Sequence, residues 1–217
     1  MLKKILTAIL FLTFSTATFA QDATDALTAL LLNIKTMQAD FTQTVTDKSK
    51  GKSLQHTQGQ MALQRPGKFR WDVTKPIAQL IIANGQRLWI YDTDLEQVTI
   101  RSFEHAAGQT PAILLSASTL SLSKDFAVKT QPMLAQIAGQ QIFLLTPKDK
   151  EDPFETIRLT FLNKQIHEMR LEDRLGHVTT IAFQNVKTGM PLAEKLFIFK
   201  PSANVDIIDE TKNTHKS

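Results

Sequence analysis

Residues 79–91 read QLIIANGQRLWIY, and this stretch predicts a β-hairpin. The dipeptide Asn84-Gly85 lies between two apolar segments, and Asn-Gly suits the positive backbone angles of a type I′ turn. This is the clearest hairpin signal in the chain, and it indicates two adjacent antiparallel strands.

The sequence does not determine which face of the second strand of this hairpin points inward. Trp89 and Tyr91 share one face of an extended segment, whereas Leu88 and Ile90 share the other. Both faces are apolar enough to be buried, so the alternation does not choose between them.

Outward from the hairpin, apolar residues recur with a period of two. Phe69, Trp71 and Val73 alternate with charged residues before it, as in a strand with one solvent-exposed face. About eleven short strands are predicted: 41–45, 61–65, 69–73, 79–83, 86–91, 95–101, 127–131, 141–146, 156–162, 166–171 and 178–183, with 196–199 as the last. The tail from Asn204 is polar and is expected to be mobile at its end.

Two helical regions interrupt this meander. Residues 22–38 carry apolar side chains at helical spacing, and Pro111 suits the first turn of a short apolar helix at 111–117. A second helical or irregular piece is predicted at 119–125. The fold class is therefore mainly β with α: an unclosed antiparallel β-barrel of about eleven strands. An N-terminal helix and a short central helical lid cover its concave face and mouth, and such a barrel can hold an apolar ligand.

Residues 1–20 have the layout of a cleaved signal peptide. Two lysines precede an apolar run that is too short to span a membrane, and small residues lead to a predicted cleavage after Ala20. Residues 21–217 are then expected to form one exported domain that does not insert stably into a membrane. Cleavage would lower the formal net charge of +4 by two, so no nucleic-acid partner is indicated.

The composition argues against an enzyme and against a metal site. The chain has no cysteine, which excludes disulfides, thiolate catalysis and an N-terminal acylated cysteine. Its five histidines show no metal-binding spacing, and no nucleophile elbow or phosphate-binding loop occurs. We therefore expect no catalytic residue and no metal.

Arg65 is the residue with the most distinctive setting, because it precedes Pro66-Gly67 and the apolar strand with Phe69 and Trp71. It is either a surface arginine at a turn or a donor that reaches across the barrel mouth to the free carbonyls of a covering helix. Ile113, Leu114 and Leu115 are in turn either core residues or the apolar face of that helix.

Five motifs, in order, resemble the LolA family of periplasmic outer-membrane lipoprotein carriers. They are Phe41-Thr42-Gln43; Arg65-Pro66-Gly67-Lys68-Phe69-Arg70-Trp71; the hairpin from Asn84 to Asp92; Asp94-Leu95-Glu96-Gln97-Val98; and Thr110-Pro111-Ala112-Ile113-Leu114-Leu115. The resemblance covers the predicted mature chain and is strongest from Asp40 to Leu115.

The resemblance implies a monomeric periplasmic chaperone without a cofactor. Such a carrier takes acylated lipoproteins from the inner-membrane ABC transporter LolCDE and delivers them to the outer-membrane receptor LolB. It implies that Arg65 is a lid latch bonded to main-chain carbonyls of the 111–117 helix. The cavity and lid residues are then Phe69, Trp71, Trp89, Ile113, Leu114 and Leu115.

The receptor LolB has the same fold, but it requires an N-terminal acylated cysteine, which this chain lacks. Two other functions stay open. The same scaffold could instead carry or sense another lipid, since the sequence does not fix the number of acyl chains. A periplasmic hydrolase would need a cleft with paired titratable side chains.

Overall fold

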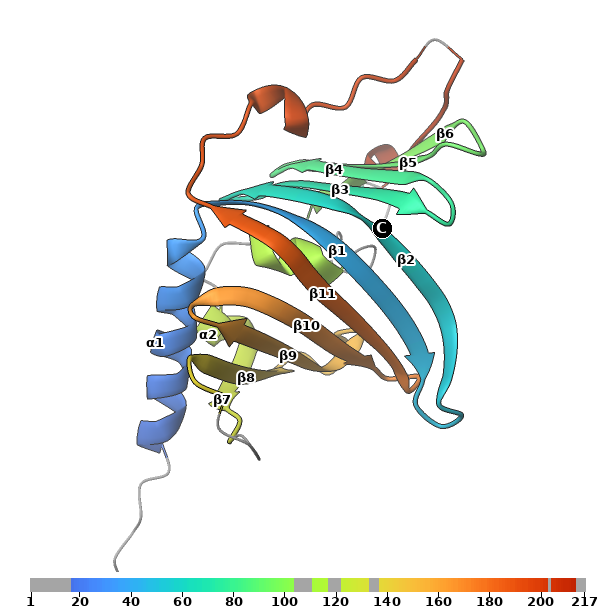
Figure 1. Cartoon of the computed structure of the whole chain (residues 1–217). Helices are drawn as coiled ribbons and strands as arrows, with labels where there is room; N and C mark the ends of the chain where they lie inside the picture. Colours follow the sequence, from blue (N-terminus) through green and yellow to red (C-terminus); the bar gives the residue numbers. More distant parts are fainter. Residues whose placement is uncertain (1–16, 104–110, 117–121, 133–136, 203, 214–217) are drawn as a thin grey trace, which may run out of the picture.

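The computed structural model describes residues 17–103, 111–116, 122–132, 137–202 and 204–213 (Figure 1). Within these residues the strands form one sheet in the order β12-β6-β5-β4-β3-β2-β1-β11-β10-β9-β8-β7. Strands β12 and β7 end the sheet and do not pair with each other, so the barrel is unclosed. The predicted fold class is confirmed.

The element bounds are as follows. The strands are β1 (Thr36–Asp47), β2 (Lys52–Gln64), β3 (Lys68–Lys75), β4 (Gln79–Asn84), β5 (Arg87–Asp92), β6 (Gln97–Ser102), β7 (Phe126–Thr130), β8 (Gln140–Pro147), β9 (Phe154–Leu162), β10 (Gln165–Asp173), β11 (His177–Thr188) and β12 (Asp206–Asp209). The helices are α1 (Ala17–Asn33), η2 (Pro111–Ser116), α2 (Leu122–Asp125), η4 (Glu194–Phe197) and η5 (Glu210–Asn213).

The core fills the concave face of the curved sheet. The inward side chains of β3, Phe69, Trp71 and Val73, are buried, as the alternation predicts. Helix α1 runs beside β7, and η2 lies inside the curve of the sheet (Figure 1). Both helices therefore bury their apolar side chains in the same core as the strands.

The predicted central hairpin forms, but its turn differs from the expected type. Asn84 ends β4, and the positive φ of +91° falls on Gly85, the first residue of the two-residue loop. That arrangement is the type II′ pattern, not type I′. The Asn84 side-chain oxygen accepts hydrogen bonds from the backbone N–H groups of Gln86 and Arg87, at 3.0 and 2.9 Å, which fixes the turn.

The N-terminal helix is displaced relative to the predicted range 22–38. It begins at Ala17 and ends at Asn33, where a tight turn returns the backbone N–H of Ile34 to the carbonyl of Leu31. Met37 is buried as expected, but it lies on β1, in the alternating series with Ala39 and Phe41. Met37 fits the helical spacing that follows Ile34 and also the strand alternation with Ala39 and Phe41. The apolar pattern therefore did not mark the end of the helix.

The C-terminal prediction was wrong in its details. The expected last strand at 196–199 overlaps η4 and crosses the outer face of β3 and β4, where Phe197 is buried. The last strand is β12, which pairs in parallel with β6. A bidentate pair joins Arg101 to Glu210, with the Nε to Oε2 distance 2.7 Å. The segment therefore straps the outside of the sheet, and the polar tail contributes an edge strand.

Gly59 on β2 permits a close approach at the centre of the core. A β-carbon at this position would collide with the backbone carbonyl oxygen of Asp72 and would lie 2.9 Å from Cζ of Phe41. The rings of Phe41 and Trp71 stack beside it, with centroids 3.5 Å apart.

We expect Gly59→Ala to lower the free energy of unfolding by about 1–3 kcal/mol, because the backbone of β3 must move to admit the methyl group. Urea unfolding monitored by circular dichroism measures this loss. The control is Gln58→Ala, one residue earlier and on the outer face, for which a change within about 0.5 kcal/mol is expected. Equal stability of the two variants would contradict the close packing.

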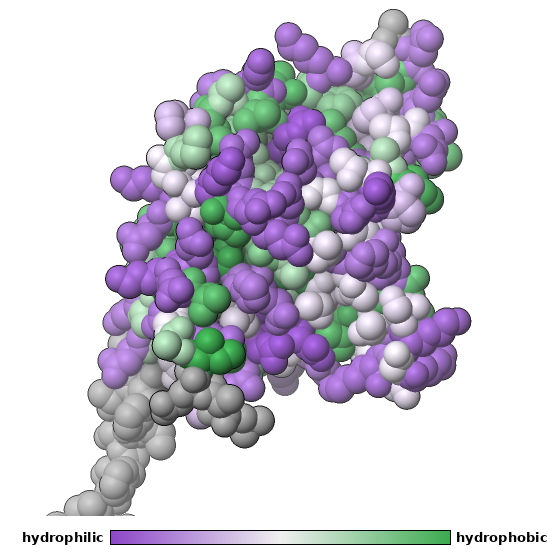
Figure 2. All heavy atoms as spheres, viewed as in Figure 1, coloured by the Kyte–Doolittle hydropathy of each residue, from purple (hydrophilic) through white to green (hydrophobic). Residues whose placement is uncertain are grey.

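Polar side chains cover most of the face seen in Figure 2, and the apolar side chains form small, separate patches. No helix in the described part of the chain is long and apolar enough to cross a membrane.

Candidate functional site

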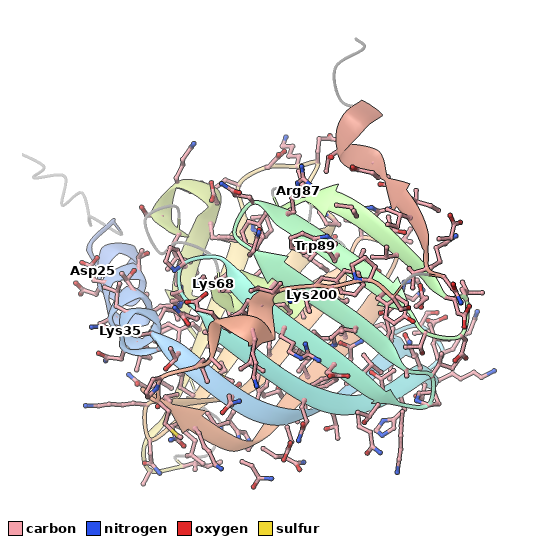
Figure 3. All side chains as sticks on the ribbon, turned by 90° about the horizontal axis from the view of Figure 1, so that it is seen from above. Asp25, Lys35, Lys68, Arg87, Trp89 and Lys200 are labelled. Carbon is pink, nitrogen blue, oxygen red and sulfur yellow. The ribbon has the colours of Figure 1, made fainter. Side chains whose placement is uncertain are left out.

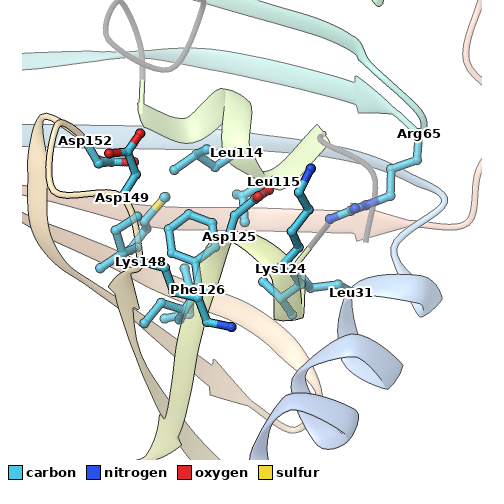
Figure 4. Close-up of a pocket in the computed structure, with 15 residues that line it drawn as sticks. Leu31, Arg65, Leu114, Leu115, Lys124, Asp125, Phe126, Lys148, Asp149 and Asp152 are labelled. Carbon is cyan, nitrogen blue, oxygen red and sulfur yellow. The ribbon is translucent and has the colours of Figure 1, made fainter. Parts of the chain in front are cut away.

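An apolar cavity of about 380 Å³ lies between η2, α2 and the strands β7 to β10 (Figure 4). Leu114 and Leu115 line it from the lid helix η2, and Leu31 lines it from α1. The strands contribute inward-facing side chains at alternating positions: Phe126, Leu145, Ile157, Leu159 and Met169. The space has the apolar lining and the size of a small-molecule cavity.

Charged side chains also line this cavity. Lys124, Asp125, Lys148, Asp149 and Asp152 all belong to its lining. Lys148 binds the α2 segment twice: its Nζ donates to the carbonyl of Ser123 at 2.7 Å, and its backbone N–H donates to the carbonyl of Asp125 at 2.8 Å. Lys148 thus attaches α2 to the end of β8.

The lid helix η2 is tied to the turn between β2 and β3 by the backbone. The N–H of Gly67 donates to the carbonyl oxygen of Ser116 at 2.9 Å. The hydroxyl of Ser116 donates to the carbonyl of Ile113 at 2.7 Å and so closes the helix end. A helix C-terminus leaves several carbonyl groups without intrahelical partners, and the turn supplies one of the missing donors.

Arg65 stands at this same turn and lines the cavity (Figure 4). Its backbone N–H donates to the carbonyl of Lys35 at 2.9 Å, which anchors the turn to the start of β1. Burial lowers the pKa of the guanidinium to about 10, so the side chain remains charged at neutral pH. Arg65 is therefore a cation that borders an apolar cavity beside its lid.

The structure brings three of the predicted residues together at this cavity: Arg65, Leu114 and Leu115. Ile113 is buried in the core, 3% exposed, and does not line the cavity. Phe69 and Trp71 are also core residues on the concave face, and Trp71 lines a separate hollow described below. The predicted bonds from the Arg65 side chain to carbonyls of η2 remain a prediction.

The placement of Trp89 in the cavity is wrong. Ile82 on β4 pairs with both Trp89 and Arg70, so these two side chains share the outer face of the sheet. Figure 3 labels Trp89 on that face. Leu88 and Ile90 take the inward positions and are buried. The strap of residues around η4 covers part of that outer face, which explains why both faces of β5 are apolar.

Sequence reasoning missed most of the cavity wall. The five lining residues on β7 to β10 were seen only as parts of strands, although their alternation already marked one buried face. Which buried residues border a cavity depends on how the lid fits against them, and no local pattern records that. The described residues contain no group of three or more His, Asp or Glu side chains that could hold a metal ion.

Comparison with known proteins gives one consistent result. A family model described as "Outer membrane lipoprotein carrier protein LolA" matches residues 32–200. A protein from Legionella pneumophila (strain Corby), named outer-membrane lipoprotein carrier protein, is 39% identical over 202 residues, which are 93% of this chain and 97% of the relative. A protein of the same name from Hahella chejuensis is 41% identical over 186 residues, covering 86% and 88% of the two chains.

A solved structure shows the same fold at lower sequence similarity. The LolA superfamily protein from Nitrosomonas europaea superposes with a TM-score of 0.50 at 15% identity, covering 84% of this chain and 99% of that one.

Proposed function

The chain belongs to the LolA family of outer-membrane lipoprotein carriers, and on that premise we propose that it shields the acyl chains of lipoproteins during their transfer between the two membranes. The observation that carries the proposal is the apolar cavity beneath a short lid. Leu114 and Leu115 on the lid face the strand side chains across this cavity. The hydrocarbon tails of acyl chains have no hydrogen-bonding groups, and the apolar side chains of this lining offer them contact.

The size of the cavity implies that the lid moves during loading. A volume of 380 Å³ is near the lower end for a drug-sized ligand, whereas three acyl chains contain roughly 45 methylene groups. The cavity is therefore too small for three chains unless the lid moves. Complete burial of these methylenes at about 0.8 kcal/mol each would exceed the strongest non-covalent affinities. A carrier that must release its cargo therefore shields the chains only in part.

We further propose that the carrier acts in the periplasm as a monomer, after removal of residues 1–20. Its partners are the inner-membrane ABC transporter LolCDE, which supplies the cargo, and the outer-membrane receptor LolB, which accepts it. The carrier forms and breaks no covalent bond and needs no cofactor, since transfer depends only on the relative affinities of donor, carrier and receptor.

The test is release of lipoproteins from spheroplasts that retain newly made acylated lipoproteins. Addition of the purified protein is expected to bring them into the supernatant as a soluble 1:1 complex. If no lipoprotein is released while a small lipid extracts from the same preparation and is identified by mass spectrometry, the protein carries or senses another lipid.

Arg65→Leu is expected to keep the fold and to change the transfer of cargo. If the half-buried Arg65 side chain holds the lid closed through one charge-assisted hydrogen bond of about 1.5–3 kcal/mol, its loss favours the open, loaded state, so hand-off to the receptor is expected to fall about tenfold or more while uptake changes less. The measurement follows lipoprotein arriving at LolB-containing outer membranes. Arg87→Leu, at an exposed position in the neighbouring hairpin, is the matched control. Normal hand-off by Arg65→Leu would argue against Arg65 as a latch.

A further inference from the structure

A second hollow of about 250 Å³ lies on the concave face of strands β1 to β5. Its polar lining consists of Gln43, Gln55, Thr57, Gln79 and Asp92, and Trp71 forms part of its wall. The strand register places these side chains on the same face of the sheet as Phe41. The hollow shares no lining residue with the cavity under the lid.

Thr57 is the unusual residue of this hollow. It is only 5% exposed, yet within the described part of the chain its hydroxyl has no hydrogen-bond partner. Buried polar groups are nearly always paired, because desolvation without a hydrogen bond is unfavourable. The hydroxyl oxygen itself has less than 1 Å² of exposed surface, so it can bond to a ligand in the hollow once neighbouring side chains shift.

The other lining groups define the chemistry of that ligand. The Gln79 amide donates to Oδ1 of Asp92 at 3.1 Å, and the remaining glutamines and the threonine can both donate and accept. The carboxylate of Asp92 only accepts hydrogen bonds, and no lysine, arginine or histidine lines the hollow, so the site disfavours an anion and favours a ligand with N–H donors. A neutral group that carries both N–H and C=O fits this set, whereas an ester can only accept.

We propose that this hollow binds main-chain amide groups of the cargo polypeptide next to its acylated residue, while the cavity under the lid takes acyl chain. This inference rests on the proposed carrier function. The stacked rings of Phe41 and Trp71 belong to the core on the concave face, and Trp71 borders the polar hollow. A lipoprotein joins an apolar part and a peptide at one residue, so a carrier with two subsites of these polarities inside the same curved sheet can hold both.

The test compares two probes: a synthetic triacylated lipopeptide with a four-serine tail, and the methyl ester of the same triacylated cysteine without a tail. Binding to the protein produced from the full-length chain is measured by displacement of a fluorescent acyl probe. Thr57→Val is expected to weaken binding of the tailed probe about fivefold, the effect of one hydrogen bond, and to leave the tail-free probe unchanged. Thr42→Val, on the outer face of β1, is the control and is expected to change neither affinity.

The stability of Thr57→Val gives a second readout. Because the substitution removes a buried hydroxyl without a partner, the melting temperature of the ligand-free protein is expected to stay the same or rise. A clear fall would mean that the hydroxyl is structural and would overturn the proposal. Gln43→Leu, at a half-buried position of the same lining, repeats the comparison and is expected to weaken the tailed probe selectively.

The remaining outcomes separate the possible causes of failure. Unchanged binding of both probes overturns the subsite. Equal weakening of both probes assigns the hollow to polar groups of the lipid itself and overturns the peptide assignment. Failure of the unsubstituted protein to bind either probe refutes the carrier function, and the subsite falls with it.

Discussion

Leu114→Asp is expected to reduce lipoprotein release from spheroplasts about tenfold or more without unfolding the protein. Leu114 lines the apolar cavity from the lid, so a carboxylate there would have to be desolvated whenever acyl chains occupied the site. The side chain is half-buried and packs against the edge of the core. In the cargo-free protein the carboxylate can therefore turn toward water, and the fold is retained.

The matched control is Leu175→Asp. Leu175 is 82% exposed in the turn between β10 and β11, so the same substitution there leaves the cavity unchanged. Near-normal release is expected for this control, and circular dichroism verifies that both variants are folded. If Leu114→Asp released as much lipoprotein as the control, the cavity under the lid would not be the site that shields the acyl chains.

Phe41→Ala is expected to lower the free energy of unfolding by about 3–5 kcal/mol. Phe41 is 1% exposed, and its ring stacks on Trp71 with an interplanar angle of 17°. Truncation loses the buried area, leaves a cavity at the centre of the sheet and removes a stacking contact of about 0.5–1.5 kcal/mol. Total stabilities of domains are only about 5–15 kcal/mol, so urea unfolding measures this loss readily.

Phe199→Ala serves as the control for this variant. Phe199 is half-buried on the outer strap, where its ring lies 5.7 Å from that of Tyr91. Its truncation is expected to lower the free energy of unfolding by clearly less, about 1–2 kcal/mol. The Phe199 side chain buries less apolar area on folding, and the surface site can relax around the smaller residue. Equal losses for the two phenylalanines would mean that the ring stack is not the centre of the core.

Alternating patterns in the sequence predicted most of the strands of the curved sheet. Phe69, Trp71 and Val73 face inward as their period of two requires, and the hairpin around Gly85 joins the predicted pair of strands. The motif order from Phe41 to Leu115 pointed to the family that the comparison found. These properties are local, because side-chain alternation and turn preference follow from the backbone geometry of a few consecutive residues.

Other features depend on contacts between distant segments. The outward position of Trp89 follows from its pairing with Ile82, and the strap covers part of the same face. The sequence of residues 86–91 alone predicts neither contact. The parallel pairing of β12 with β6 joins segments about a hundred residues apart.

The sequence by itself thus determined the curved sheet, its inward alternation and the family, because each rests on short-range periodicity or on motif order. Only the tertiary structure decided which buried residues border a cavity and which simply fill the core. Ile113 and Leu114 are neighbours with nearly the same side chain, yet one is core and the other lines the lid cavity. That difference arises where the lid meets the sheet, and it is set by packing between elements, which local periodicity does not encode.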